Sequence, residues 1–488
     1  MKKRYLILFT AMMSIFSSCD GWLSIQPEND QVSDEYWADK EEVEAVLGAG
    51  YVHLRSALQN MLVWGELRGN TIGLGGFFNV DLQRFAVWDI IPNNDLVKWE
   101  RFYQVINDAN MVIEYAPAVV DRDPSFSEPI MKSFISEAYF LRALSYFYLV
   151  RNFRDVPLVL KPYMDDREPF EVEKSPENDI LHQIKMDLVN AIEFSKEIAP
   201  SIWETKGRST KWAIYAALAD VYLWTGEYDK AIEACDMVIN SGRVGLIDGV
   251  VNNRNNWYTI FNPGNSNESI FELQFDFARN QTNSLLSWFG TNFNYVASQH
   301  AVFLYESSSE DIRGVGASYT ENNFRVWKYL GAEAGTGVPR TNSDQNWIIY
   351  RMADIYLMKA EAYVMKGPGS YEDAMEMVTR VRSRAGISQP LAQGGTELEM
   401  LSIVMDERGR EFLGEGKRWY DLLRVGKRDG YRYKDYLIGQ VLISAPASSA
   451  PIIRSKLLNE DSHFLPIHNS ELIVNTKLVQ NPYYENLN

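Results

Sequence analysis

Residues 212–242 read "WAIYAALADVYLWTGEYDKAIEACDMVINSG", and residues 353–385 read "ADIYLMKAEAYVMKGPGSYEDAMEMVTRVRSRA". Both stretches contain an apolar helical stripe, a glycine that stops the helix and a second helical stripe, so they form a weak internal repeat. The matching positions are Ala219 and Ala360, Tyr222 and Tyr363, Gly226 and Gly367, Tyr228 and Tyr371, and Ala231 and Ala374. Small alanines let two antiparallel helices approach closely, and each tyrosine fills the neighbouring groove. The repeat therefore predicts tetratricopeptide-like (TPR-like) helical hairpins whose apolar stripes lie in the core.

Further helices are predicted on both sides of this repeat. Apolar spacing places them over roughly 96–116, 128–152 and 397–414. Ser175 and Pro176 are expected to open another helix, as its N-cap and its first residue. We therefore predict a mostly α fold, in which TPR-like hairpins near 128–242 and 350–386 form a scaffold.

Two segments interrupt the helical pattern. Residues 64–95 are loop-like, because several glycines there break any helix, and aromatic residues stand beside those glycines. Residues 243–345 are an insertion rich in Asn, Gly, Ser and aromatic residues, in which the alternating run 269–275 predicts a short strand. Irregular loops held on a rigid scaffold commonly carry binding residues. The two segments together are thus the expected ligand-binding region.

The N-terminus has the pattern of a lipoprotein signal. Three basic residues, 2–4, precede the mostly apolar residues 5–16, and Ser17 and Ser18 then lead to Cys19. The apolar run is too short to span a bilayer comfortably, so it is typical of a cleaved signal peptide. A cysteine directly after small residues resembles a bacterial lipobox. The alternative is an ordinary secretory signal with an incidental cysteine.

We expect residues 1–18 to be removed and residues 19–488 to form a single body, with acyl chains on Cys19 holding it at a membrane surface. No other apolar run approaches the ~20 residues of a transmembrane helix. One further cysteine, Cys235, remains in the mature chain, so no intramolecular disulfide is expected.

Composition excludes some classes of partner. The precursor carries a formal charge of −17, with 65 acidic against 48 basic residues. Nucleic acids and anionic lipids bind basic patches, so neither is an expected partner. The 13 Trp and 27 Tyr residues instead suggest that some rings serve as flat platforms for a ligand.

The sequence contains no pattern that indicates catalysis. The five histidines are scattered, without a zinc-binding pair, and "GEGKR" at 414–418 has Glu411 where a phosphate-binding loop requires glycine. Neither a metal nor a cofactor is expected. Ion pairs with a structural role are predicted for Asp311 with Arg313 and for a cluster of alternating charge near the end of one helix. That cluster consists of Glu407, Arg408, Arg410, Glu411, Glu415, Arg418 and Asp421.

Seven segments, taken together and in order behind the signal, resemble the SusD-like (SusD/RagB) family of outer-membrane lipoproteins over essentially the whole chain. They are residues 136–159, 184–191, 206–232, 350–367, 380–386, 406–424 and 464–484. Two positions depart from the family pattern. Arg154 replaces the usual glycine before "DVP", and His468 replaces a proline.

The resemblance implies a function as well as a fold. It implies anchoring at the external face of the outer membrane and a SusC-like TonB-dependent β-barrel transporter as partner. The implied ligand is an oligosaccharide or polysaccharide, or a peptide in some members, and the implied role is noncatalytic. A surface glycoside hydrolase and a TPR scaffold for protein assembly are the alternatives. The identity of the ligand and the binding of Ca²⁺ stay open.

The resemblance also places ligand contacts on the irregular loops opposite the scaffold. The candidates are Asn70, Phe77, Phe78 and Trp88 in the first loop and Trp288, Phe289, Asn292 and Tyr295 in the second. Aromatic rings would stack on the apolar faces of sugars while polar side chains bond the hydroxyl groups. Alternatively, these rings pack the loops onto the body, because large aromatic residues are usually well buried. Trp99, Trp212 and Trp419 are assigned to the core by their helical spacing.

Overall fold

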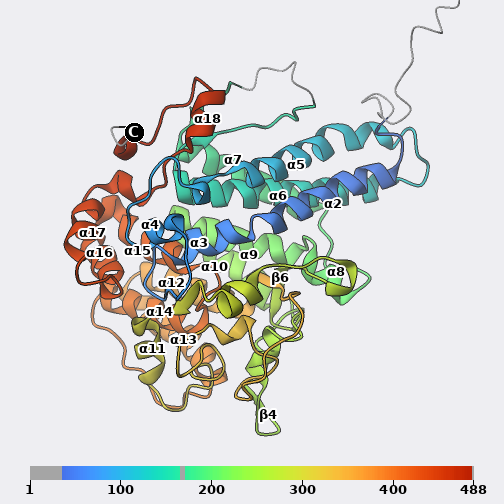
Figure 1. Cartoon of the computed structure of the whole chain (residues 1–488). Helices are drawn as coiled ribbons and strands as arrows, with labels where there is room; N and C mark the ends of the chain where they lie inside the picture. Colours follow the sequence, from blue (N-terminus) through green and yellow to red (C-terminus); the bar gives the residue numbers. More distant parts are fainter. Residues whose placement is uncertain (1–35, 165–170, 486–488) are drawn as a thin grey trace, which may run out of the picture.

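A row of antiparallel helices forms the body of the protein in a computed structural model that describes residues 36–164 and 171–485 (Figure 1). Successive helices of the row pack on one another, and the hairpin of α9 and α10 packs on that of α12 and α13. The row consists of α2 (Lys40–Ser56), α5 (Glu100–Val119), α6 (Glu128–Phe153), α7 (Glu177–Glu193), α9 (Lys211–Thr225), α10 (Tyr228–Ile239), α12 (Met352–Met365) and α13 (Tyr371–Arg384). This arrangement confirms the mostly α, TPR-like fold.

The repeated hairpins form for the reasons that the sequence indicates. In α9, Thr210 accepts a hydrogen bond from the amide of Ala213, and Gly226 ends the helix with a left-handed backbone (φ 78°). Glycine adopts that conformation without a steric penalty. Ala219 and Ala360 are fully buried where the helices meet.

The remaining helices are shorter or lie outside the row. They are α3 (Leu58–Glu66), α4 (Val80–Ala86), α8 (Ile202–Gly207), α11 (Gln299–Glu306), α14 (Glu397–Glu411), α15 (Arg418–Tyr431), α16 (Lys434–Ile443), α17 (Ala450–Leu457) and α18 (Asn469–Val474). Helices α4, α16 and α17 were not predicted from the sequence. The first of these corrects the loop predicted over 64–95, because Asn79 caps α4 by accepting the amide of Leu82 at 2.9 Å.

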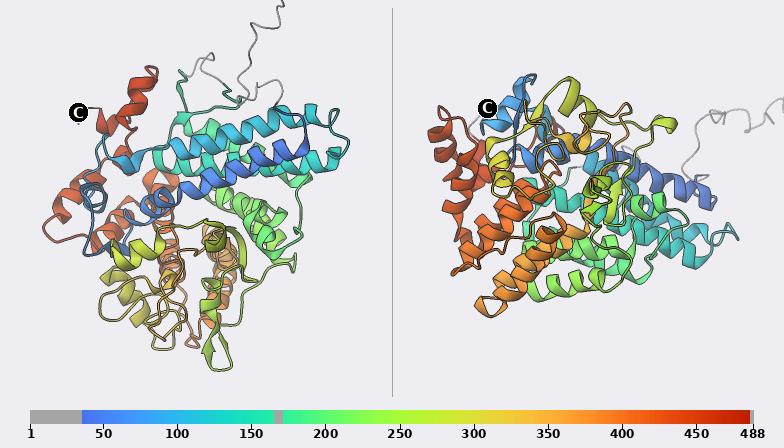
Figure 2. Two further views of the ribbon diagram at one scale, coloured as in Figure 1. Left: turned by 45° about the vertical axis from the view of Figure 1, so that its right-hand side comes forward. Right: turned by 90° about the horizontal axis from the view of Figure 1, so that it is seen from below.

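Four short antiparallel strand pairs complete the described fold. They are β1 (Ile72–Leu74) with β7 (Tyr295–Ala297), β2 (Val156–Pro157) with β3 (Lys174–Ser175), β4 (Val250–Val251) with β5 (Arg254–Asn255), and β6 (Ser269–Leu273) with β8 (Trp347–Arg351). The strand predicted over 269–275 is therefore confirmed as β6. In Figure 1 and the left view of Figure 2, the loop-rich insertion that carries β4 to β7 lies below α2, α5, α6 and α7.

The start of α7 differs from the prediction. Ser175 belongs to β3, where it pairs with Val156, so it cannot cap the helix. Helix α7 begins at Glu177, and the amide of Glu177 donates instead to the carboxylate of Asp155 at 2.9 Å. A side chain distant in sequence thus replaces the local cap.

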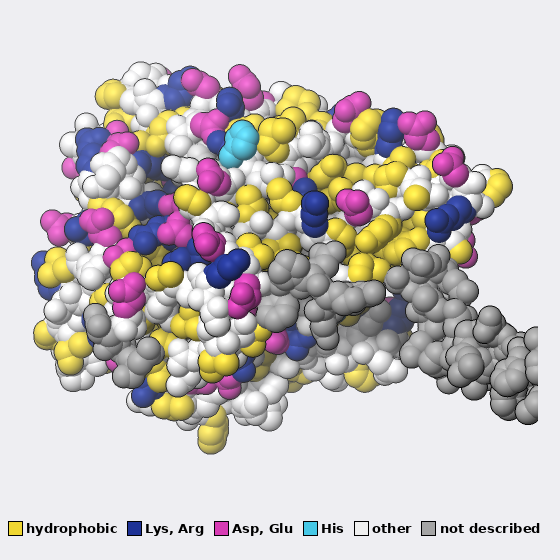
Figure 3. Space-filling view, turned by 90° about the horizontal axis from the view of Figure 1, so that it is seen from above, with side chains coloured by type: hydrophobic (Ala, Val, Ile, Leu, Met, Phe, Trp, Pro, Cys, Tyr) yellow, Lys and Arg dark blue, Asp and Glu magenta, His cyan; other side chains and the backbone are white. Residues whose placement is uncertain are grey.

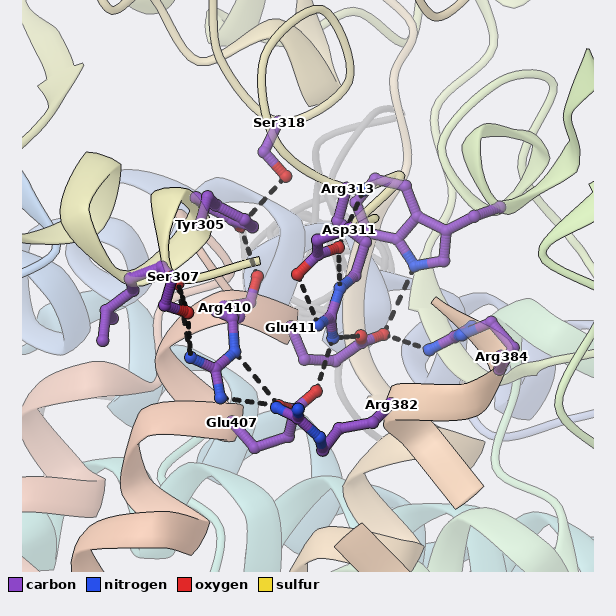
Figure 4. A network of polar contacts seen from close by, with 12 residues as sticks. Tyr305, Ser307, Asp311, Arg313, Ser318, Arg382, Arg384, Glu407, Arg410 and Glu411 are labelled. Carbon is purple, nitrogen blue, oxygen red and sulfur yellow. Dashed lines mark hydrogen bonds and ion pairs between the residues drawn. The ribbon is translucent and has the colours of Figure 1, made fainter. Parts of the chain in front are cut away.

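A buried network of ion pairs, part of which is drawn in Figure 4, joins the insertion to β8, α13 and α14. Arg313 donates to Asp311, Glu407 and Glu411 at 2.6–2.8 Å, and Arg384 and Arg351 also bind Glu411. These contacts confirm the structural role predicted for the pair of Asp311 and Arg313. Buried pairs of Arg410 with Glu407, Arg408 with Asp421 and Arg351 with Glu415 extend that role to most of the charged cluster at 407–421.

The arginine and lysine side chains of this network keep its buried carboxyl groups ionised. Burial by itself raises the pKa of Glu411, but the guanidinium groups of Arg384, Arg351 and Arg313 hold that pKa well below its usual range. Arg351 and Lys328 likewise hold the pKa of Glu415 at about 2, against the effect of burial. These carboxylates are ionised, fully paired and fully buried.

No helix within residues 36–164 and 171–485 has both the length and the apolar character needed to cross a membrane. The predicted signal peptide and Cys19 lie outside the described residues, and the predicted division of the chain at residue 19 stays a prediction.

Candidate ligand-binding groove

The two predicted loops meet in the folded protein. Strand β1 pairs with β7, so that Ile72 faces Ala297 and Leu74 faces Tyr295. The contact continues beyond the strands, because the amide of Gly75 donates to the carbonyl oxygen of Asn294 at 2.8 Å and the Asn294 side chain donates to the Phe77 carbonyl at 2.5 Å. Segments more than 200 residues apart in sequence therefore form one surface.

A groove of about 610 Å³ runs beside this joint. Its volume lies within the range of about 300–1,000 Å³ that is typical of small-ligand sites. Four parts of the chain line the groove. They are the segment around β1 and α4 (Leu67, Gly69, Ile72, Gly73, Leu74, Phe78, Gln83, Ala86, Val87, Trp88), β7 and the start of α11 (296–299), Phe324, and α16, α17 and the residues between them (Val441, 443–446, Ile453).

Phe77 and Phe78 are the exposed aromatic residues of the first loop. Their side chains are 67% and 43% exposed, and Phe78 lines the groove. Trp88 also lines the groove but is only 5% exposed, because its ring packs edge-on against Trp419 with centroids 5.0 Å apart. Phe77 and Phe78 are thus available for contact, while Trp88 forms part of the floor.

Asn70 lies behind the groove rather than in it. Its side chain is fully buried, donates to Gln440 at 2.9 Å and accepts from Arg418 at 2.7 Å. Its carbonyl oxygen accepts from the hydroxyl groups of Ser298 and Ser444 at 2.6 and 2.7 Å. Asn70 therefore ties β1 to α11, α15 and α16, and we interpret it as a support for the groove.

The candidates from the second loop lie next to the groove. Phe289 and Tyr295 are fully buried, and the Phe289 ring stacks on Tyr329 with centroids 5.5 Å apart. Trp288 is half-buried and packs edge-on against Tyr295, whereas Asn292 is exposed. None of these four lines the groove, although the following residues, 296–299, do. Ligand contact by Trp288 and Asn292 stays a prediction.

Comparison with known proteins identifies the family. The model of the SusD family matches residues 189–484, which is more than half of the chain. The chain belongs to the SusD family. A second family model, described as starch-binding and associating with the outer membrane, matches residues 75–223 of this SusD-family protein and so includes α4 of the groove.

Individual relatives cover nearly the whole chain. A SusD-like protein of Formosa agariphila is 25% identical over 98% of this chain and 98% of its own length. The crystal structure of a SusD superfamily protein from Bacteroides vulgatus has a TM-score of 0.75 at 21% identity and covers 92% of this chain and 100% of the other. A structure named as a laminarin-binding SusD-like protein has a TM-score of 0.69 at 24% identity, with 91% and 99% covered. At these identities, the structural matches establish the fold.

Several groove residues of this SusD-family protein were not predicted from the sequence. Gln83, Gln299 and Phe324 stand among many polar and aromatic residues of the loops, and nothing in their spacing distinguishes them. The wall formed by 443–446 and Ile453 comes from a segment to which the sequence assigned no role. Ile443 and Ile452 are exposed, as apolar residues at contact sites often are, but that exposure is visible only in the folded protein.

Two amide side chains supply free hydrogen-bonding capacity in the groove. Ser298 and Ser444 already donate to the Asn70 carbonyl. Gln83 and Gln299, by contrast, are exposed and make no side-chain hydrogen bond with another described residue. Each amide offers both a donor and an acceptor, which suits a hydroxyl group.

Other polar features of the described residues do not form a comparable site. Within 36–164 and 171–485, no group of three or more His, Cys, Asp or Glu residues could hold a metal ion. On the face drawn in Figure 3, Lys and Arg side chains are interspersed with Asp and Glu and form no broad basic patch. The groove between the joined loops is therefore the candidate site.

Proposed function

We propose that this SusD-family protein captures an oligosaccharide or polysaccharide nutrient without catalysis and delivers it to a SusC-like TonB-dependent transporter. The observation that carries the proposal is the groove at the β1–β7 joint, where exposed aromatic rings flank free amide groups. Aromatic faces and hydroxyl-directed amides are the two kinds of contact that a sugar needs. The described carboxylates in the buried ion-pair network are paired with arginine or lysine and lie outside the groove, which supports a binding role over hydrolysis.

The relatives support the class of ligand. One matching family model is described as starch-binding, and one structural relative is named as laminarin-binding. Both names refer to glucose polymers. We therefore propose glycan as the ligand of this chain and treat peptide as the competing outcome of the test.

We further propose that the protein is held at the outer membrane by acyl chains on Cys19 and faces the cell exterior. The pattern of residues 1–19 supports lipid attachment, and the family description supports association with the outer membrane. Cys19→Ser should yield a folded protein that leaves the membrane fraction. Unchanged fractionation would contradict lipid attachment at Cys19. Copurification of the native protein with a β-barrel tests the transporter partnership.

The binding proposal can be tested with protein that lacks residues 1–19. We would titrate it against a panel of polysaccharides and peptides and repeat the measurement with Phe77→Ala and Phe78→Ala. Loss of one exposed aromatic contact should weaken glycan binding by about tenfold, equivalent to about 1.4 kcal/mol.

Phe303→Ala is the control for Phe78→Ala, because Phe303 on α11 is also exposed, at 67%, but does not line the groove as Phe78 does. Equal loss of binding in Phe303→Ala would remove the groove as the site. Binding of peptides alone would replace glycan as the ligand. Absence of binding across the panel would contradict capture by the isolated protein.

A further inference from the structure

Among the described residues, no ionisable side chain lines the groove. Its walls are aliphatic, aromatic, small or neutral polar, from Leu67 on one side to Ile453 on the other. Other hollows among the described residues differ in this respect, although they are smaller, at about 390–440 Å³. Their linings include Glu100 and Glu471, Arg154 and Asp461, and Glu197 and Arg243, respectively. In an acidic protein with 23% charged residues, an uncharged groove of this size is an informative exception.

The charged side chains beside Trp88 neutralise one another. Asp89 follows Trp88 and binds Arg84 at 3.2 Å and Lys456 at 2.9 Å. Lys456 also donates to the Trp88 carbonyl at 2.8 Å. An anionic ligand would have to displace Asp89 to gain either cation.

Two further cations require consideration. Arg418 lies behind the lining, where it is only 3% exposed and donates to the Asn70 side chain at 2.7 Å and to the Met405 carbonyl oxygen at 2.6 Å. Arg325 follows the lining residue Phe324. Its guanidinium group lies over the Phe293 ring, 4.9 Å from the centroid, and it has no ion-pair partner among the described residues. Arg325 itself does not line the groove. Arg325 therefore does not form an anion site in the groove, and its substitution can test that conclusion.

Two physical effects disfavour an anionic ligand in this groove. A carboxylate or sulfate that enters an apolar wall loses hydration, and without a partner this desolvation disfavours binding. The protein also carries a formal charge of −17, so a polyanion is repelled at long range. A neutral sugar incurs neither cost, and its hydroxyl groups can bond the free amides of Gln83 and Gln299.

We propose that the groove selects uncharged glycans and rejects those that carry uronic acid or sulfate groups. The inference rests on the proposed function, and it names the class of glycan that the same site takes. Selection follows from the absence of a cation in the lining, while the apolar floor and the two amides retain the neutral chain.

Matched ligands test this selection directly. Laminarin, amylopectin and galactomannan would each be compared with a form in which the primary hydroxyl at C6 has been oxidised to a carboxylate. The oxidised form of whichever neutral glycan binds should bind at least about tenfold more weakly. Discrimination should persist at about 0.5 M salt, where long-range repulsion is screened. Discrimination that disappears at high salt would overturn selection by the groove, because only the net charge would then be responsible.

Charge introduced into the groove gives an independent test. Gln83→Lys and Gln299→Lys should each strengthen binding of the oxidised glycan relative to the neutral one. Gln393→Lys is the control, because it adds the same charge at an exposed position outside the groove lining. Arg325→Gln should leave the preference for the neutral glycan unchanged. An equal shift in Gln393→Lys would also overturn the inference.

Failure of this inference is distinguishable from failure of the proposed function. If oxidised glycans bind the wild-type protein as tightly as neutral ones, charge selection is wrong while glycan capture stands. If neither form of any glycan binds, both proposals fail.

Discussion

Gly75 approaches the backbone of Phe293 so closely that a β-carbon at position 75 would lie 2.1 Å from the Phe293 carbonyl oxygen. The contact is between backbones, so no flexible side chain can yield. Glycine is therefore required at this position for space. This close approach continues the β1–β7 pairing that joins the first loop to the second beside the groove.

Gly75→Ala should separate the two loops locally. Overpacking of this kind typically costs about 1–3 kcal/mol, and we expect a lower free energy of unfolding together with weaker glycan binding. Gly73→Ala, in β1 two residues earlier, is the matched control, because a β-carbon at position 73 would meet nothing within 4 Å and stability should be unchanged. Equal stability of the two variants, measured by urea unfolding, would contradict the close approach.

Trp88→Ala should mainly lower the stability of the protein, whereas Phe78→Ala should mainly weaken glycan binding. Trp88 is buried against Trp419, so its truncation should lower the free energy of unfolding by about 3–5 kcal/mol. Phe78 is largely exposed, so Phe78→Ala should cost about 1 kcal/mol or less while still weakening glycan binding. Thermal unfolding and ligand titration on both variants check this, and a large loss of stability in Phe78→Ala would show that its ring belongs to the core.

The helical scaffold could be predicted from sequence because the apolar spacing and the stop residues of each helix lie within or next to that helix. The helix predicted over about 128–152 is α6 (Glu128–Phe153), and the glycine stop at Gly226 ends α9 as expected. The cap of α7 could not be predicted in the same way. Asp155, 22 residues earlier in the chain, supplies it, and the pairing of Ser175 with Val156 in β2–β3 excludes the local candidate.

The candidate site could be predicted only in part, since burial of a loop residue depends on distant segments. Phe77 and Trp88 both stand in a glycine-rich stretch, and no local pattern separates them. Trp88 is covered by Trp419 from α15, whereas nothing comparable covers Phe77. The contribution of 443–446 to the groove likewise depends on how α16 packs, which nearby residues do not encode.

Glu411→Gln should be strongly destabilising. The substitution replaces by a neutral amide the carboxylate that pairs with three buried guanidinium groups, those of Arg313, Arg351 and Arg384. Breaking a buried ion pair on one side costs about 3–5 kcal/mol, because the other charge remains buried. The exposed pair of Glu376 and Arg380 is the control, and Glu376→Gln should change the free energy of unfolding by less than about 0.5 kcal/mol. Similar urea midpoints for the two variants would show that the network adds little to stability.

Glu66 should make the stability of the protein fall as the pH rises towards neutrality. Its carboxyl group is fully buried and accepts from the amides of Gly416 and Lys417 and from Thr71. Burial raises its pKa to about 7, although these hydrogen bonds oppose the shift. The folded state therefore binds a proton more tightly than the unfolded state, and this contribution is lost between about pH 4.5 and pH 7.

Glu66→Gln removes that titration while keeping the shape of the side chain. The free energy of unfolding of the variant minus that of the wild type should therefore increase by about 2–3 kcal/mol between about pH 5 and pH 8, at about 1.36 kcal/mol per pKa unit. Urea unfolding at a series of pH values measures this difference, and the comparison removes any constant offset from the substitution itself. A difference that does not change with pH would mean that Glu66 stays ionised in the folded protein across this range, with the two backbone amides sufficient to hold its charge.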